Sequence, residues 1–169
     1  GKIVKIDKDI PEGENVDLVD AEGMHIYPGF VEAHGHIGLD GYGIGYEGHD
    51  YNEMNDPVAP HLRAIDAINP FDPCMRMAAE AGVTSFATGP GSANILGGTF
   101  AAIKPVGTCA DDMIVKNDVA MKCAFGENPK RCYQNKSISS RMTSAANLRN
   151  ALKKAALYKA KVEAAGDDV

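Results

Sequence analysis

The sequence lacks the features that mark membrane-spanning, secreted or disulfide-rich proteins. It has no apolar run near the roughly 18 residues that a transmembrane helix needs. Its first residues, GKIVKIDKDI, do not show the basic-then-apolar order of a signal peptide. Its four cysteines form no CxxC motif and are too sparse for a disulfide scaffold. We therefore expect a soluble, cytoplasmic protein with reduced thiols. The first residue is glycine rather than methionine, which is compatible with a start inside a longer chain.

Composition favours a single globular domain without a nucleic-acid or membrane partner. A chain of 169 residues with 44% hydrophobic content can fill one core. The charge is uneven, with 6 basic and 18 acidic residues over 1–115 but 11 basic and 2 acidic residues over 116–161. A basic segment can bind nucleic acid, but this one has no aromatic residues interleaved in the manner of a stacking surface. We interpret its lysines and arginines as solvent-facing positions of helices.

The first 70 residues read as a small β element, a strand and a long loop. Residues 2–7 alternate apolar and polar side chains, and residues 16–30 form a second strand candidate with a Gly break and a Pro stop. Residues 30–37 then predict a strand. Residues 38–70 are rich in Gly, Asn, Asp and Pro, and an ordered loop of that length is uncommon unless it has a function. We expect an active-site loop there.

The second part of the chain alternates helices and strands. Residues 71–82 predict a helix with Asp72 as N-cap, Pro73 at the first helical position and Gly82 as the stop. The rest of the pattern gives a strand at 83–88, a loop at 89–98, a strand at 99–107, and helices at 117–126 and 144–165. Strands separated by helices indicate βα units, so the expected fold class is α/β with a parallel sheet.

The motif PGFVEAHGHIGLD places two histidines one residue apart at the end of a strand candidate. Side chains alternate along a strand with period two, so His34 and His36 should share a face with Cβ atoms about 6.6 Å apart. Imidazoles so placed can bind one ion such as Zn²⁺. The alternative is a pair of polar residues satisfied within a strand, and the spacing alone does not decide between them.

The neighbourhood of the pair resembles the start of the amidohydrolase superfamily. The resemblance is strongest over residues 16–39, where a β element and a Pro-Gly turn lead into a strand that ends in His-x-His. It continues through NPFDPCMRMAAEAGVTSFATGPGSANILGGTFAAIKPVG and AMKCAFGENPKR, which look like the imidazolonepropionase-like and prolidase-like branch. The implied fold is the amino-terminal part of a TIM-type (β/α)₈ barrel over residues 29–169, preceded by part of a small β-sandwich over residues 1–28.

The resemblance implies a metal-dependent hydrolase with His34 and His36 as ligands of a divalent metal, with zinc the expected ion. The metal would activate water for attack on a C–N bond of a cyclic amide or a peptide-like substrate. Glu32 would either orient a ligand imidazole or make structural hydrogen bonds. Such a site also needs two later histidines and an aspartate that acts as proton shuttle. None is found at a suitable place, so the catalytic residue is expected beyond the chain.

Several other residues are candidates for contact with a small-molecule substrate. Histidines in the long loop, His49 and His61, are assigned to loop structure or substrate contact rather than to metal. Ser92 and Asn94 lie in the predicted loop at 89–98. Lys104 either binds substrate, caps a strand or, in carboxylated form, bridges two metals, as a lysine does in some members of the superfamily. We also expect a homo-oligomer.

Length argues against a complete barrel. A (β/α)₈ barrel typically needs about 250 residues, whereas residues 29–169 leave room for about half of one. A half barrel leaves strand edges unpaired. We therefore expect a fragment of a longer enzyme. The alternative is a non-catalytic half barrel that serves only as a folding or assembly unit.

Overall fold

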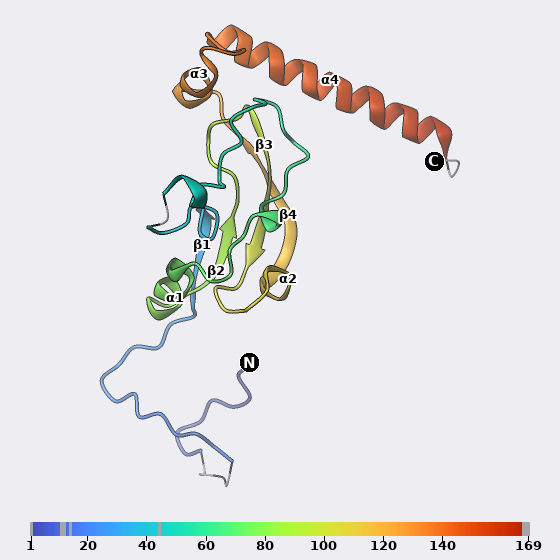
Figure 1. Ribbon diagram of the computed structural model, residues 1–169. Coiled ribbons are helices and arrows are strands. Elements are labelled where there is room, and N and C mark those ends of the chain that lie inside the picture. Colours follow the sequence, from blue (N-terminus) through green and yellow to red (C-terminus); the bar gives the residue numbers. More distant parts are fainter. Residues whose placement is uncertain (1, 11–12, 14, 44, 167–169) are drawn as a thin grey trace.

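The chain forms a mixed four-stranded sheet with helices around it (Figure 1). The computed structural model describes residues 2–10, 13, 15–43 and 45–166. Across the sheet the order is β1 (Phe30–Gly35), β2 (Val83–Thr88), β3 (Leu96–Ile103) and β4 (Ile114–Cys123). β1 pairs with β2 in parallel, whereas the pairs β2–β3 and β3–β4 are antiparallel. The α/β class is confirmed, but the prediction of a sheet parallel throughout is wrong.

The lengths of the connections explain this mixture. Parallel neighbours need a crossover of about a dozen residues or more. The chain between β1 and β2 provides one, including helix α1 (Pro73–Glu80). Only residues 89–95 join β2 to β3, and residues 104–113, with the short helix α2 (Ala110–Met113), join β3 to β4. These shorter connections join antiparallel neighbours. A closed barrel stays a prediction.

Helix α1 begins and ends where its sequence signals predicted. The Asp72 carboxylate accepts a hydrogen bond of 2.9 Å from the Cys74 backbone N–H, and Pro73 is the first helical residue. The helix ends just before Gly82, whose φ of +86° favours a residue without Cβ. Asp72 also accepts from the Gly38 N–H at 3.2 Å. One buried carboxylate thus starts α1 and fixes the turn after β1.

The predicted helix at 117–126 is wrong, because most of this segment belongs to strand β4. Ala120 lies opposite Phe100, and Lys122 lies opposite Gly98. The period-two recurrence of Val119, Met121 and Cys123 suits a strand, and pairing with β3 satisfies its backbone. Propensity over ten residues is a weak signal when a neighbouring strand offers backbone pairing along most of the segment.

The long loop, described over residues 38–43 and 45–70, packs against the rest of the molecule. It contains two 3₁₀ helices, η1 (Tyr46–Gly48) and η2 (Ala64–Asp66). Its second half follows β3: the Ala59 N–H donates to the Leu96 carbonyl at 2.7 Å, and the Thr99 N–H donates to the Leu62 carbonyl at 2.9 Å. A Cβ at Gly98 would lie 2.4 Å from that Leu62 oxygen. The loop is thus built onto the sheet.

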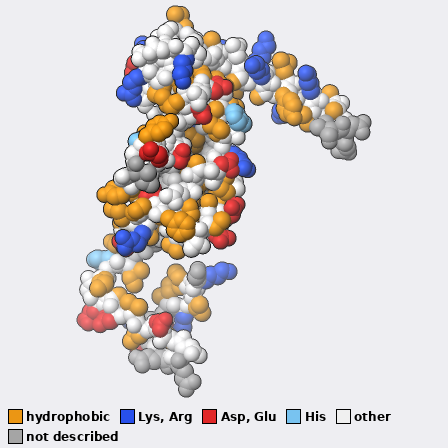
Figure 2. Space-filling model, in the orientation of Figure 1, with side chains coloured by type: hydrophobic (Ala, Val, Ile, Leu, Met, Phe, Trp, Pro, Cys, Tyr) orange, Lys and Arg blue, Asp and Glu red, His pale blue; other side chains and the backbone are white. Residues whose placement is uncertain are grey.

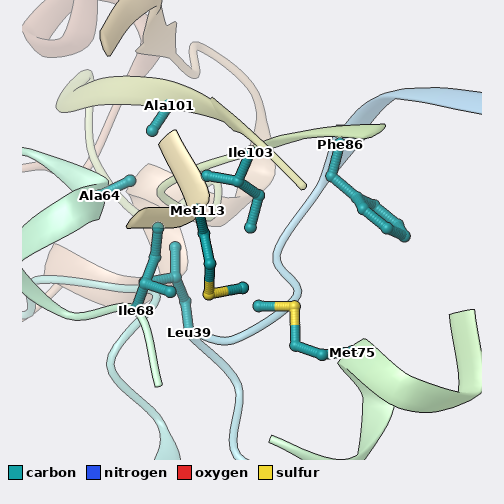
Figure 3. Packing of buried hydrophobic residues seen from close by; sticks show 8 residues of the cluster. All are labelled: Leu39, Ala64, Ile68, Met75, Phe86, Ala101, Ile103 and Met113. Atoms are coloured by element: carbon teal, nitrogen blue, oxygen red, sulfur yellow. The ribbon is translucent and has the colours of Figure 1, made fainter. Parts of the chain in front are cut away.

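Two apolar clusters hold these parts together. The larger lies between the sheet, α1 and the long loop, and Figure 3 shows the side chains of Met75 and Met113 converging within it. Its members are Leu39, Ala64, Ile68, Met75, Phe86, Ala101, Ile103 and Met113. The smaller cluster joins the loop after β2 to helix α3 (Glu127–Tyr133) and comprises Ala93, Ile95, Tyr133 and Ile138.

Both ends of the chain extend away from this body (Figure 1). Residues 2–10, 13 and 15–29 form no strand or helix, so the β-sandwich of residues 1–28 stays a prediction. Helix α4 (Arg141–Ala165) confirms the helix expected at 144–165 and begins earlier, with Ser140 as N-cap. Its expected apolar face is largely uncovered, with Leu152 57% exposed, and Figure 2 shows basic and apolar side chains along it. Within the described ranges, no helix is both long and apolar enough to cross a membrane.

Replacing Asp72 by alanine is expected to lower the free energy of unfolding by about 1–3 kcal/mol, because two backbone N–H groups lose a buried acceptor. The Asp72 side chain is only 3% exposed. The matched control is Asp66→Ala, which removes an exposed ion pair with Arg63 and should cost much less. Urea unfolding followed by circular dichroism measures both. Equal losses would contradict the role assigned to Asp72.

Candidate functional site

The two predicted histidines lie together at the carboxyl end of β1. His34 belongs to the strand, and His36 follows its last residue. Their ring centroids are 5.5 Å apart and their planes meet edge to face at 85°. His34 is exposed and His36 is half-buried. The period-two spacing therefore brings the two imidazoles side by side, as expected.

A backbone carbonyl fixes the tautomer of His36. Its Nδ1 lies 2.7 Å from the carbonyl oxygen of Gly89, in the loop after β2. A carbonyl oxygen can only accept, so Nδ1 must carry the proton. A neutral His36 then presents the lone pair of Nε2. A hydrogen bond from one ring nitrogen to a nearby acceptor is the usual way in which proteins prepare the other nitrogen for a metal.

His34 has a basic neighbour that the sequence did not reveal. The Nζ of Lys122, on β4, lies 2.9 Å from His34 Nε2. The charge of Lys122 is the largest influence on the pKa of His34 and lowers it below its ordinary value, and burial adds to this effect. Burial in turn lowers the pKa of Lys122. The Lys122 amine and the His34 imidazole thus form a polar contact next to His36.

Of the two roles considered for Glu32, the structure shows structural hydrogen bonding rather than orientation of an imidazole. Its Oε1 accepts a hydrogen bond of 2.9 Å from the backbone N–H of His34. The orientation of His36 comes instead from Gly89. The carboxylate thus stabilises the backbone of β1 next to the site.

The donor set fits two ligands of a borderline metal and is incomplete. Imidazole nitrogen is a preferred ligand of Zn²⁺, and a catalytic zinc site commonly has three protein ligands. Among the residues that the structure describes, no group of three or more His, Cys, Asp or Glu side chains could hold a metal ion. His34 and His36 can therefore supply part of a metal site.

The other predicted site residues do not gather around the histidines. His61 is exposed on the long loop. Lys104 donates to Ser85 Oγ at 2.8 Å, toward the end of the sheet that lies away from the histidines. Ser92 accepts from Asn128 Nδ2 at 2.6 Å, which ties the loop after β2 to α3. Their contact with a substrate stays a prediction.

Asn94 is a structural anchor and does not fit the predicted contact with substrate. Its side chain is fully buried, and its Nδ2 donates to the carbonyls of Glu53 and Asp56 at 3.0 and 2.8 Å. The same nitrogen lies 2.8 Å from the hydroxyl of Tyr133 on α3. Burial raises the pKa of Tyr133, whose hydroxyl donates to the Glu53 carbonyl. This pair pins the long loop to the body.

An open cleft adjoins the histidines. Its volume is about 530 Å³, within the range of small-molecule sites. Tyr51 forms a wall that the cleft shares with the metal-site candidates, because its ring lies 5.7 Å from the ring of His36. The polar and aromatic lining includes Tyr46, His49, Asn52, Glu53 and Arg63. Most of the lining comes from the long loop, with His49 in the wall, and a role for this loop in an active site stays a prediction.

Sequence reasoning missed two members of this site, Gly89 and Lys122. Gly89 acts through its backbone, which leaves no chemical signature in the sequence. Lys122 was hidden by the helical prediction for its segment. The period-two apolar pattern of that segment could have placed Lys122 on a strand. It could not have shown that the Lys122 side chain reaches His34.

Comparisons with known proteins agree with the architecture. No protein-family model matches the chain. It is 36% identical over 148 residues to "Amidohydrolase tasK" of Hapsidospora irregularis, a match that spans 79% of this chain and 15% of that protein. A crystal structure of an amidohydrolase from Thermotoga maritima MSB8 superposes on 95% of this chain with 43% identity and a TM-score of 0.88. The chain covers 42% of that structure. Its sheet and helices thus share the fold of part of an amidohydrolase.

Replacing Lys122 by methionine is expected to raise the pKa of His34 in the metal-free chain toward its ordinary value. The nearby positive charge disfavours a second one on the imidazole, and methionine removes it at similar length. Lys104→Met is the matched control, because Lys104 contacts Ser85 instead. Titration of the His34 ring protons by NMR reports the change. A rise of the same size in the Lys104 variant would disprove the specific coupling.

Proposed function

We propose that this chain is the amino-terminal part of a metal-dependent amidohydrolase, in which His34 and His36 bind a divalent ion, most simply Zn²⁺. The observation that carries the proposal is the pairing of the two imidazoles at 5.5 Å, with His36 Nδ1 bonded to Gly89. Similarity to amidohydrolases at 36% and 43% identity supports it. The proposed branch is the imidazolonepropionase-like and prolidase-like one.

Each residue of the site has a distinct part in this proposal. A bound divalent ion would supply an activated water and an electrophile for the substrate carbonyl. His36 offers Nε2, since Gly89 holds its other nitrogen. His34 offers a nitrogen on the same side of the sheet, next to Lys122. Phe100 lies under His34, with ring centroids 5.5 Å apart, and keeps this side of the site apolar.

Lys122 is a better candidate than Lys104 for a third protein ligand. Some members of the superfamily use a carboxylated lysine, and such a residue must reach the histidines. The amine of Lys122 lies 2.9 Å from His34 Nε2, whereas that of Lys104 is bonded to Ser85. We therefore transfer the lysine role considered for Lys104 to Lys122.

The substrate would lie in the cleft beside Tyr51. The expected reaction is hydrolysis of a C–N bond in a cyclic amide or a peptide-like molecule. The cleft's volume of about 530 Å³ suits a small molecule of this kind, and its tyrosines and amides can pack against and hydrogen-bond to an amide group. The wall shared with His36 would set the scissile bond next to the metal ligands.

The proposal includes a longer enzyme with a complete (β/α)₈ barrel. The chain spans 15% of one matched amidohydrolase and 42% of the other. In the part of the chain seen in the structure, β1 and β4 are edge strands, and Phe30 and Val31 on β1 are 63% and 71% exposed. Further barrel strands would cover these edges and supply the remaining histidines and the aspartate.

In this longer enzyme, His36→Ala should lower kcat/KM by more than the roughly 10–100-fold typical of losing only an outer partner of a ligand. A lost ligand cannot be replaced by water with the same activation. His25→Ala is the control, because His25 is exposed on the segment before β1 and has no part in the proposed site. Hydrolysis of cyclic amides and dipeptides measures both variants. Normal turnover by a metal-depleted His36→Ala enzyme would rule out the assignment.

The 169-residue chain alone is expected to lose its metal on dialysis against a chelator. His34 and His36, even with Lys122 beside them, lack the histidines and the aspartate that the proposed complete site takes from later strands, and within the described residues no third His, Cys, Asp or Glu joins the pair. Zinc, iron and manganese in the dialysed protein can be measured by atomic emission. A stoichiometric, chelator-resistant ion would mean that this chain completes the site by itself and that no ligand from later strands is needed.

The competing hypothesis is a non-catalytic role. The observation that favours it is the exposed edge of β1, because such edges can pair with other chains in an assembly. The two hypotheses differ in the longer protein. Absence of both hydrolysis and metal binding there would favour a half barrel that acts only as a folding or assembly unit.

A further inference from the structure

The loop after β2 turns back onto the end of β1 at Gly89. The Gly89 N–H donates to the Gly35 carbonyl at 3.2 Å, and the Gly89 carbonyl accepts from His36 Nδ1 at 2.7 Å. Thr88, fully buried, donates its hydroxyl to the Ile37 carbonyl at 2.7 Å. These hydrogen bonds extend the contact between the two segments that follow β1 and β2 beyond the β1–β2 ladder. The carbonyl that meets His36 is therefore held by its neighbours on both strands.

Gly89 can lie there only because it has no side chain. A Cβ at this position would be 2.3–2.7 Å from three carbons of the Phe100 ring. Phe100 is only 5% exposed, so its ring has little room to move aside. The φ of Gly89 is not among the positive values found in the chain, so an alanine there would be compatible with the backbone. Close approach, rather than backbone conformation, requires the glycine.

The same phenylalanine supports the other half of the site. Its ring centroid lies 5.5 Å from that of His34, and Lys122 Nζ lies 5.8 Å from it. A shift of this ring would therefore be felt by His34 and Lys122 as well as by Gly89. The position of His36 is in this way coupled to that of its partner histidine.

A second close approach holds the far side of the loop. The Gly91 N–H donates to the Tyr51 carbonyl at 2.6 Å, and a Cβ on Gly91 would lie 2.5–2.8 Å from atoms of Asn52 and Tyr51. Asn52 Oδ1 also accepts from the Ala93 N–H at 3.1 Å. The Tyr51 ring then lies against His36. The loop after β2 thus holds His36 in two ways: the Gly89 carbonyl accepts from its Nδ1, and Tyr51, which the loop contacts, packs against its ring.

We propose that Gly89 is a positioning residue for His36: its carbonyl, admitted by the missing Cβ and backed by Phe100, locks the Nδ1–H tautomer before any metal binds. Nε2 then carries the lone pair that a metal needs, already in the metal-free protein. This preparation lowers the entropic and tautomeric cost of binding the ion. The inference rests on the proposed function only where it concerns the metal; the tautomer itself is a property of the free chain.

The first test measures the tautomer directly in the metal-free 169-residue chain. Long-range ¹H–¹⁵N correlation at pH 8, where imidazoles are neutral, distinguishes a protonated Nδ1 from a protonated Nε2. We expect His36 to be in the Nδ1–H form and exposed His61 to show the mixture of an unheld imidazole. A His36 protonated at Nε2 would overturn the proposal without any variant.

The second test compares three glycine-to-alanine variants. In Gly89→Ala the tautomer of His36 should become mixed and zinc affinity in the longer enzyme should fall about 10–100-fold. Gly126→Ala, where a Cβ meets nothing within 4 Å, should change neither. Gly107→Ala places a Cβ 2.4 Å from Met113 Cγ, so it controls for a clash in the core away from the histidines.

The outcomes separate the two proposals. If Gly89→Ala and Gly107→Ala lose stability alike and the His36 tautomer is unchanged in both, Gly89 has a structural role only and the inference fails. If the tautomer behaves as expected but the unaltered longer protein binds no metal, the positioning role stands and the proposed function fails. Thermal unfolding of each variant reports the loss of stability independently of both readouts.

Discussion

The meeting of two chain segments at Gly89 is the constraint on which the site depends. It joins the end of β2 to the end of β1 through the Gly35 and His36 hydrogen bonds. It also requires an empty Cβ position, because Phe100 fills the space behind it. The end of the sheet, the packing of Phe100 and the orientation of His36 are therefore linked by one close backbone contact. A larger residue there would have to displace a core side chain.

The mixed topology determines which side chains reach the histidines. Because β3 and β4 run antiparallel, β4 returns past Phe100 and brings Lys122 back to the end of the sheet where β1 stops. A helical segment at the same sequence position would have carried this amine away from the sheet. The long loop adds the outer wall, since Asn94 and Tyr133 anchor it and Tyr51 faces His36. Site and cleft thus come from segments far apart in sequence.

Local signals in the sequence predicted the local features of the structure. Asp72, Pro73 and Gly82 predicted α1, because capping and termination depend on a few adjacent residues. Apolar runs predicted β2, but β3 only in part, because the strand expected at 99–107 runs from Leu96 to Ile103. Period two placed His34 beside His36. The likeness to amidohydrolases was also predicted from the motif and is supported by the comparisons. Each of these inferences needed only a short window of sequence.

Features that depend on pairing between distant strands could not be predicted in this way. Whether Lys104 or Lys122 approaches a histidine depends on register, and the β3–β4 ladder contains irregularities, including a non-glycine residue of positive φ at Asp118. An irregularity of one residue reverses the face on which every later side chain lies. The sequence therefore predicted the histidine pair, whereas the ladder decided which amine lies beside it. The same reasoning applies to Gly89, whose contribution is a carbonyl placed by its neighbours.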